Sequence, residues 1–169
     1  MNKPFCRKSF ETNNEKGIKA SMSLLNQHGL ETRDTTEAYS SHDFIVGLKS
    51  LELKVEAEVS NVWRESFWPY DEVTVPHRKR RSKADIFVMI NKTGDAAIVA
   101  DMDLVKASPV REKFVFSTKM NEPFFWVPVE HFDLYVRGTD GVWREKKMQG
   151  GIIGRHISSV HPGQTSEAV

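Results

Sequence analysis

Residues 51–59, LELKVEAEV, alternate apolar and charged side chains without interruption. Because successive side chains of a strand point to opposite faces, this pattern predicts a strand with one apolar and one charged face. The charged face carries Glu52, Lys54, Glu56 and Glu58. The rise per residue of a strand places the last two about 7 Å apart. The segment therefore presents two neighbouring carboxylates.

Residues 43–48, DFIVGL, precede this strand and form a candidate hairpin with it through Lys49–Ser50. With a two-residue loop, the numbers of opposed residues sum to 99, which sets Asp43 directly across from Glu56. Facing carboxylates destabilise a sheet unless another charge compensates them. A divalent cation such as Mg²⁺ fits, since it favours a few carboxylate oxygens plus water and phosphate. In the alternative interpretation, the charged residues of the 51–59 strand simply form the solvent face of a half-exposed strand: Glu52, Lys54, Glu56 and Glu58.

One early helix and about six strands predict a single α/β or α+β domain. The helix runs over residues 13–28 and stops at Gly29. Besides the hairpin, strands are expected at residues 72–75, 84–90, 96–102, 124–129 and 132–137. The segments ADIFVMI and AAIVA are nearly continuous apolar runs, as expected for strands covered on both faces. The fold class is therefore α/β, with a central mixed sheet and the N-terminal helix packed on it.

Glu15 shares a helical stripe with Ile18, Met22 and Leu25, which would direct its carboxylate toward the sheet. The alternative is local: Thr12-x-x-Glu15 matches a capping box, in which Glu15 satisfies the first amides of the helix.

The order of a helix with Glu15, then Asp43-x12-Glu56-Ala57-Glu58 on a hairpin, resembles the PD-(D/E)XK nuclease superfamily. The resemblance covers roughly residues 11–102. The order and spacing of these residues are similar to those in small resolvase-like members of the superfamily. It implies a restriction-endonuclease-like domain in which a metal-activated water attacks a DNA phosphodiester. Two positions depart from the motif: His42 stands where the family has proline, and Glu58 replaces the lysine.

The resemblance assigns metal ligation to Asp43, Glu56 and the carbonyl of Ala57, with Mg²⁺ or Mn²⁺ as the cofactor. In this scheme Glu58 would hold a second metal ion or orient the attacking water. Glu15 becomes a candidate outer ligand of the same catalytic site.

A basic stretch, HRKRRSK, occupies residues 77–83. Its cations are predicted to contact the DNA backbone, with an affinity that falls as salt rises: they are Arg78, Lys79, Arg80, Arg81 and Lys83. Arg78, Lys79 or Lys83 is a candidate to replace the missing lysine of the motif. The alternative is a solvated edge that blocks aggregation.

A second acidic pair, Asp101 and Asp103, follows the strand predicted at 96–102. With Lys106 it forms an alternative metal site, although acids at a strand end next to a turn are commonplace.

Composition limits the remaining options. The chain has 169 residues, 24 basic and 23 acidic side chains, a net charge of +1 and 39% hydrophobic residues, typical of one folded domain.

We expect a flexible arm at 1–10, the nuclease-like domain at 11–147 and a flexible or loosely docked tail at 148–169. No signal peptide or membrane-spanning run is visible, and the single Cys6 fits the cytoplasm.

The sequence thus predicts a metal-dependent endonuclease that hydrolyses DNA phosphodiester bonds. The alternatives are a catalytically inactive nuclease-like module that binds nucleic acid or protein, and an interaction protein without a nucleic-acid role. A homodimer is expected by analogy, because cutting both strands of a duplex often uses two sites.

Overall fold

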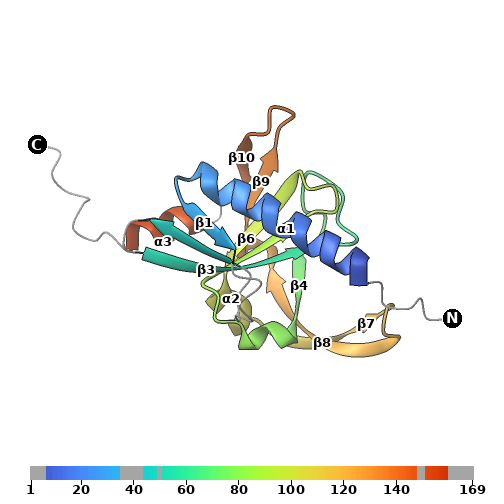
Figure 1. The fold of residues 1–169 in the computed structure, drawn as a ribbon. Helices are drawn as coiled ribbons and strands as arrows, with labels where there is room; N and C mark the ends of the chain where they lie inside the picture. Colours follow the sequence, from blue (N-terminus) through green and yellow to red (C-terminus); the bar gives the residue numbers. More distant parts are fainter. Residues whose placement is uncertain (1–6, 35–43, 49–50, 148–150, 160–169) are drawn as a thin grey trace, which may run out of the picture.

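The computed structural model describes residues 7–34, 44–48, 51–147 and 151–159. Its helices are α1 (Arg7–Gln27), α2 (Met102–Ala107) and α3 (Ile152–Ser159), with 3₁₀ turns η2 (His77–Arg81) and η3 (Val129–His131). Its strands are β1 (Glu31–Asp34), β2 (Phe44–Leu48), β3 (Leu51–Val59), β4 (Glu72–Pro76), β5 (Ile86–Ile90), β6 (Ala96–Asp101), β7 (Val110–Val115), β8 (Met120–Pro128), β9 (Asp133–Arg137) and β10 (Trp143–Lys147). Figure 1 shows α1 crossing the large sheet, with β7 and β8 extending away below it.

The described strands form a large sheet in the order β1-β2-β3-β5-β6-β9-β10 and a small sheet in the order β4-β8-β7. In the large sheet β3 and β5 run parallel, while the other neighbouring pairs run antiparallel. The predicted α/β class, with a mixed sheet and the N-terminal helix packed on it, is confirmed.

Two apolar cores lie on opposite faces of the large sheet. The helix-side core joins α1 and α3 to one face, and the sheet-side core joins the small sheet and α2 to the other. The helix-side core includes Leu24, Leu25, Leu53, Val55, Ala57, Ile86, Val88, Ile152 and Ile153. The sheet-side core includes Trp63, Val73, Val75, Phe87, Met89, Ile98, Met102, Phe125 and Val127. All of β5 and the first five residues of β6 are buried, as predicted from their apolar runs.

The hairpin of β2 and β3 has the predicted register. Phe44 pairs with Val55 and Leu48 with Leu51, so the numbers of each pair sum to 99. The two residues that join the strands, and Asp43 on the other side of β2, lie outside the described residues.

The helix begins earlier than predicted. α1 starts at Arg7, within the stretch that the sequence assigns to an arm, and continues to Gln27. Glu15 therefore lies inside the helix and cannot cap its first turn, so the predicted capping box is wrong. Apolar periodicity is the signal that predicts a helix, and residues 7–14, RKSFETNN, do not display it.

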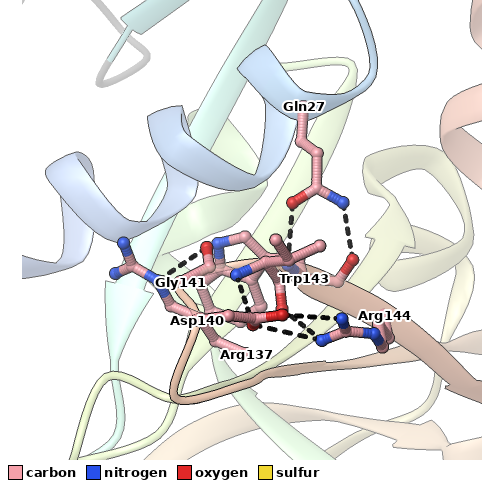
Figure 2. A network of polar contacts seen from close by, with 7 residues as sticks. Gln27, Arg137, Asp140, Gly141, Trp143 and Arg144 are labelled. Atoms are coloured by element: carbon pink, nitrogen blue, oxygen red, sulfur yellow. Dashed lines mark hydrogen bonds and ion pairs between the residues drawn. The ribbon is translucent and has the colours of Figure 1, made fainter.

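The last strand is tied to α1 by side-chain contacts (Figure 2). Gln27 accepts a hydrogen bond from the Trp143 amide at 2.7 Å and donates to the Trp143 carbonyl at 2.5 Å. Asp140 pairs with Arg144 at 2.7 Å in the turn before β10. Because the Trp143 ring is also buried, β10 is fixed to the helix by both its backbone and its side chain.

Close packing of α1 on β3 predicts an unusual response to alanine. A Cβ on Gly17 would lie 2.6 Å from Val59 Cγ2. Alanine normally stabilises a helix interior by up to about 1 kcal/mol relative to glycine. Here the overlap, which costs about 1–3 kcal/mol, outweighs that gain. We expect Gly17→Ala to lower the free energy of unfolding by about 1 kcal/mol in urea denaturation.

Gly154→Ala in α3 is the matched control, since no other part of the described chain lies within 4 Å of the point that a Cβ would occupy there. It should leave stability unchanged or raise it slightly. Equal stabilisation by both substitutions would contradict the close approach of α1 to β3.

Candidate active site

Glu56 and Glu58 project from β3 on the face opposite α1. Val55 and Ala57 alternate with them and belong to the helix-side core. On the other face, Glu56 lies beside Phe87 of β5, which belongs to the sheet-side core. Glu56 is only 7% exposed, so its charge requires compensation from the protein. Glu56 therefore does not lie on a half-exposed solvent face, as the alternative interpretation of the strand expected.

That compensation comes from the basic stretch. The Lys79 ammonium forms an ion pair with Glu56 Oε1, and the Ser82 hydroxyl donates to Glu56 Oε2 at 2.8 Å. The Lys79 side chain is 18% exposed, so the pair lies at the edge of the core. Of the three cations proposed to replace the missing lysine, Lys79 is therefore the one that contacts Glu56.

Local geometry explains why Lys79 turns inward. β4 ends at Pro76 and continues directly into η2, whose turn is closed by the Ser82 amide donating to the Lys79 carbonyl at 2.9 Å. Lys106 of α2 then donates to the Ser82 carbonyl at 2.5 Å. Both ends of the turn are held, and Lys79 and Ser82 face the same carboxylate.

Glu58 occupies a different electrostatic environment. Its Oε2 atom is buried, with no hydrogen-bond partner among the described residues. Burial raises the pKa of Glu58 above 4.5, and the negative charge of Glu56 adds to this, whereas Lys79 and Arg78 act in the opposite direction. Active sites often contain a carboxyl group of raised pKa beside a carboxylate whose charge is balanced by a cation, and structural ion pairs shift pKa values as well.

The other basic side chains of the stretch point to solvent. Arg78, Arg80, Arg81 and Lys83 are all exposed. The structure thus divides the predicted DNA-contacting residues into one lysine at the carboxylates and four cations available to a partner.

Ala57 and Glu15 complete the predicted set. Ala57 lies between the two glutamates and opposite Val88 in the register. Glu15 projects from α1, on the other side of the large sheet, and forms an ion pair with Lys19 at 2.7 Å. It lines a pocket of about 520 Å³ together with Lys16, Lys19, Ala20, Ser23, Thr93, Gly94 and Arg137. The structure does not bring Glu15 to Glu56.

The alternative acidic site is not assembled either. Asp101 pairs with Arg155 at 2.7 Å and also contacts the His156 ring, while Lys106 is bonded to Ser82. Both partners of Asp101 come from α3, a helix that was not predicted from the sequence. His156 and Arg155 are separated from Asp101 by more than 50 positions, so no local signal links them.

Comparisons with known proteins give one distant structural likeness. No family model matches the chain, and no curated protein sequence does. Among solved structures, the bacterial homing endonuclease I-Ssp6803I is similar at 12% identity, with a TM-score of 0.46, over 92% of this chain and 97% of that one. Such a distant likeness transfers no residue role. Within the described residues, no helix is long and apolar enough to cross a membrane.

The raised pKa of Glu58 predicts a pH-dependent effect of Glu58→Gln. The folded protein holds this proton more tightly than the unfolded chain, so the Glu58 contribution to stability is lost as pH rises from 4.5 through the folded pKa. The neutral amide removes that loss. In EDTA, we expect the variant to be more stable than wild type near pH 8, with little difference near pH 4. Denaturation curves at both pH values measure this, and a gain confined to low pH would contradict it.

The Glu56–Lys79 pair predicts strong coupling. Lys79→Met leaves a buried carboxylate with Ser82 as its remaining described partner, and breaking a buried pair costs about 3–5 kcal/mol. The double variant Glu56→Gln/Lys79→Met removes both charges and should recover most of that loss. A double-mutant cycle in urea measures the coupling. Lys83→Met, which removes an exposed cation nearby, should change stability by less than about 0.5 kcal/mol. Equal losses in Lys79→Met and the double variant would contradict the pairing.

Proposed function

We propose that the protein is a metal-dependent endonuclease that hydrolyses DNA phosphodiester bonds. The observation that supports this is Lys79 at Glu56, beside Glu58. The motif of residues 43–58 has glutamate where the nuclease superfamily has lysine, and here a lysine from another segment stands at the same carboxylates. Such a cation can stabilise the charge that develops on a phosphate, and the two acids can bind a metal ion that activates water.

The residues fit a hard cation such as Mg²⁺ in their donor chemistry. Glu58 has a buried oxygen without a partner among the described residues, and each Glu56 oxygen keeps a second lone pair beyond the contacts to Lys79 and Ser82. Within the described ranges, however, no group of three or more acidic, His or Cys side chains is placed to hold a metal. The proposal therefore requires Asp43, which the sequence predicts across from Glu56 and which lies outside those ranges.

When bound, Mg²⁺ or Mn²⁺ would polarise the phosphate and lower the pKa of the attacking water. Asp43, Glu56 and the Ala57 carbonyl would hold the ion. Lys79 would donate hydrogen bonds to the phosphate as negative charge develops, and Glu58 would orient the water or hold a second ion.

The exposed cations of residues 78–83 would hold the DNA backbone next to these carboxylates. Their contacts to phosphate carry no sequence information, so they position the duplex without selecting it. The affinity they provide should fall with increasing salt.

One observation favours an inactive binding module as the second candidate. Both oxygens of Glu56 already have protein partners, so its charge is balanced without a metal. Such a module would bind DNA in a salt-dependent way whether or not a divalent ion is present.

A cleavage assay distinguishes the two candidates. Plasmid, single-stranded and four-way-junction DNA are incubated with Mg²⁺, Mn²⁺ or EDTA. We expect metal-dependent cleavage that falls about a hundredfold or more in Asp43→Ala and Glu56→Ala. Lys79→Met should lower it by about 10²–10³-fold, since it removes a donor to the developing charge.

Glu130→Ala, which removes an exposed carboxylate in η3, is the control and should cleave like wild type. Circular dichroism establishes that each variant is folded. Cleavage that persists in EDTA, or full activity of Glu56→Ala, would refute the proposal. Salt-sensitive DNA binding without cleavage in either metal would favour the inactive module.

A further inference from the structure

The ribbon formed by β7 and β8 extends beyond the rest of the small sheet. β4 pairs only with residues 124–128 of β8, whereas β7 pairs with residues 120–125. The distal part of β8 therefore has β7 as its described neighbour and forms a two-stranded ribbon. Residues 110–114 of β7 are all exposed. Figure 1 shows the ribbon projecting away from the large sheet.

The end of this ribbon is apolar. Phe116 is 86% exposed, Met120 63% and Phe114 48%. The two phenylalanine rings contact each other edge to face, with centroids 5.2 Å apart. Large apolar side chains gathered at one exposed end mark a contact surface for a partner.

Cations also lie on β7, at positions that alternate with Phe114 and therefore project from the other face of the ribbon. The Arg111 guanidinium lies 4.5 Å from the centre of the Trp126 ring, and Lys113 lies 5.4 Å from that of Phe124. Lys119 sits in the turn itself. Residues 110–122 carry three cations against two glutamates. Arg111 also pairs with Glu72 at 2.7 Å, and Lys113 donates to the Thr74 hydroxyl at 3.0 Å, so both cationic side chains are held on that face by β4.

The ribbon also adjoins the basic turn of the candidate active site. Pro76, the last residue of β4, pairs with Phe124 of β8 and leads directly into η2. The first residue of η2, His77, packs its ring against Phe125 with centroids 5.0 Å apart. The exposed cations of residues 78–83 therefore begin where the ribbon joins the domain. This continuity gives the combined surface a positive charge suited to a polyanion.

We propose that the β7–β8 ribbon is a DNA-binding arm that enters the major groove of duplex DNA. The inference rests on the proposed function for its choice of DNA as the partner. A two-stranded ribbon fits the major groove, where the thymine methyl is the apolar group on the base edges. Phe114 and Phe116 contact thymine methyls, while Lys119 in the turn and the exposed cations of residues 78–83 contact phosphates. The arm thus gives the protein a preference for thymine-containing sites that η2 cannot provide.

The test measures DNA binding in EDTA, so that it does not depend on cleavage. Two fluorescent duplexes of about three helical turns are compared by anisotropy, one of alternating adenine and thymine and one with deoxyuridine in place of thymidine. Phe114→Ser/Phe116→Ser should bind the thymine duplex about tenfold more weakly than wild type. Wild type should lose about fourfold on deoxyuridine for each methyl contacted, and the double variant should not distinguish the duplexes. Val62→Ser, at a side chain 75% exposed in the loop after β3, should bind like wild type.

Three results would overturn the arm. The first is that the double variant binds the thymine duplex as tightly as wild type does. The second is that wild type binds the deoxyuridine duplex as tightly as the thymine duplex. The third is that wild type is a dimer and the double variant a monomer, with the same affinity for DNA. The last result would identify the ribbon as a contact between two copies of the chain. If metal-dependent cleavage that Glu56→Ala abolishes is found in any of these cases, the proposed nuclease stands without the arm. If instead no cleavage is found but the duplexes are distinguished as expected, the arm stands and the nuclease fails.

Discussion

The burial of Glu56 on a central strand is the constraint on which the rest of the site depends. Its strand neighbours Val55 and Ala57 face α1, so the carboxylate has to face the sheet-side core. An ion there costs several kcal/mol unless a charge and hydrogen bonds compensate it. Lys79 and Ser82 provide both from a single turn, and Lys106 fixes the far end of that turn. These contacts connect α2, through the η2 turn, to the Glu56 carboxylate on β3.

Local periodicity predicted the centre of the fold. The alternation of residues 51–59 and the two-residue connection fixed the hairpin register, and the continuous apolar runs marked β5 and β6 as strands covered on both faces. These features follow from the pleat of a strand and from its burial, both of which determine the spacing of apolar residues along the sequence. The same alternation correctly placed Glu56 and Glu58 on one face.

Other elements had no such signal. β7, VREKFV, is exposed along almost its whole length, and β10, WREKK, buries one ring, so neither shows the apolar alternation of a half-buried strand. Glu15 illustrates the opposite error, since the helical stripe suggested that it faces the sheet while its carboxylate pairs with Lys19 in solvent. Choosing Lys79 over Arg78 and Lys83 required the geometry of η2, in which tertiary contacts decide which side chain turns inward.

Stability alone does not account for the charges that meet at β3. A buried ion pair is generally no better than well-packed apolar side chains of the same volume, and often worse. Glu58 adds a buried oxygen without a described partner, and burial holds its pKa above the ordinary value, so the free protein is less stable for carrying it. Structural networks normally satisfy their buried polar atoms, whereas sites that act on a ligand leave some unsatisfied until the ligand arrives. The unsatisfied Glu58 oxygen, next to the Glu56–Lys79 pair and the exposed cations, is therefore an observation that supports the proposed nuclease site.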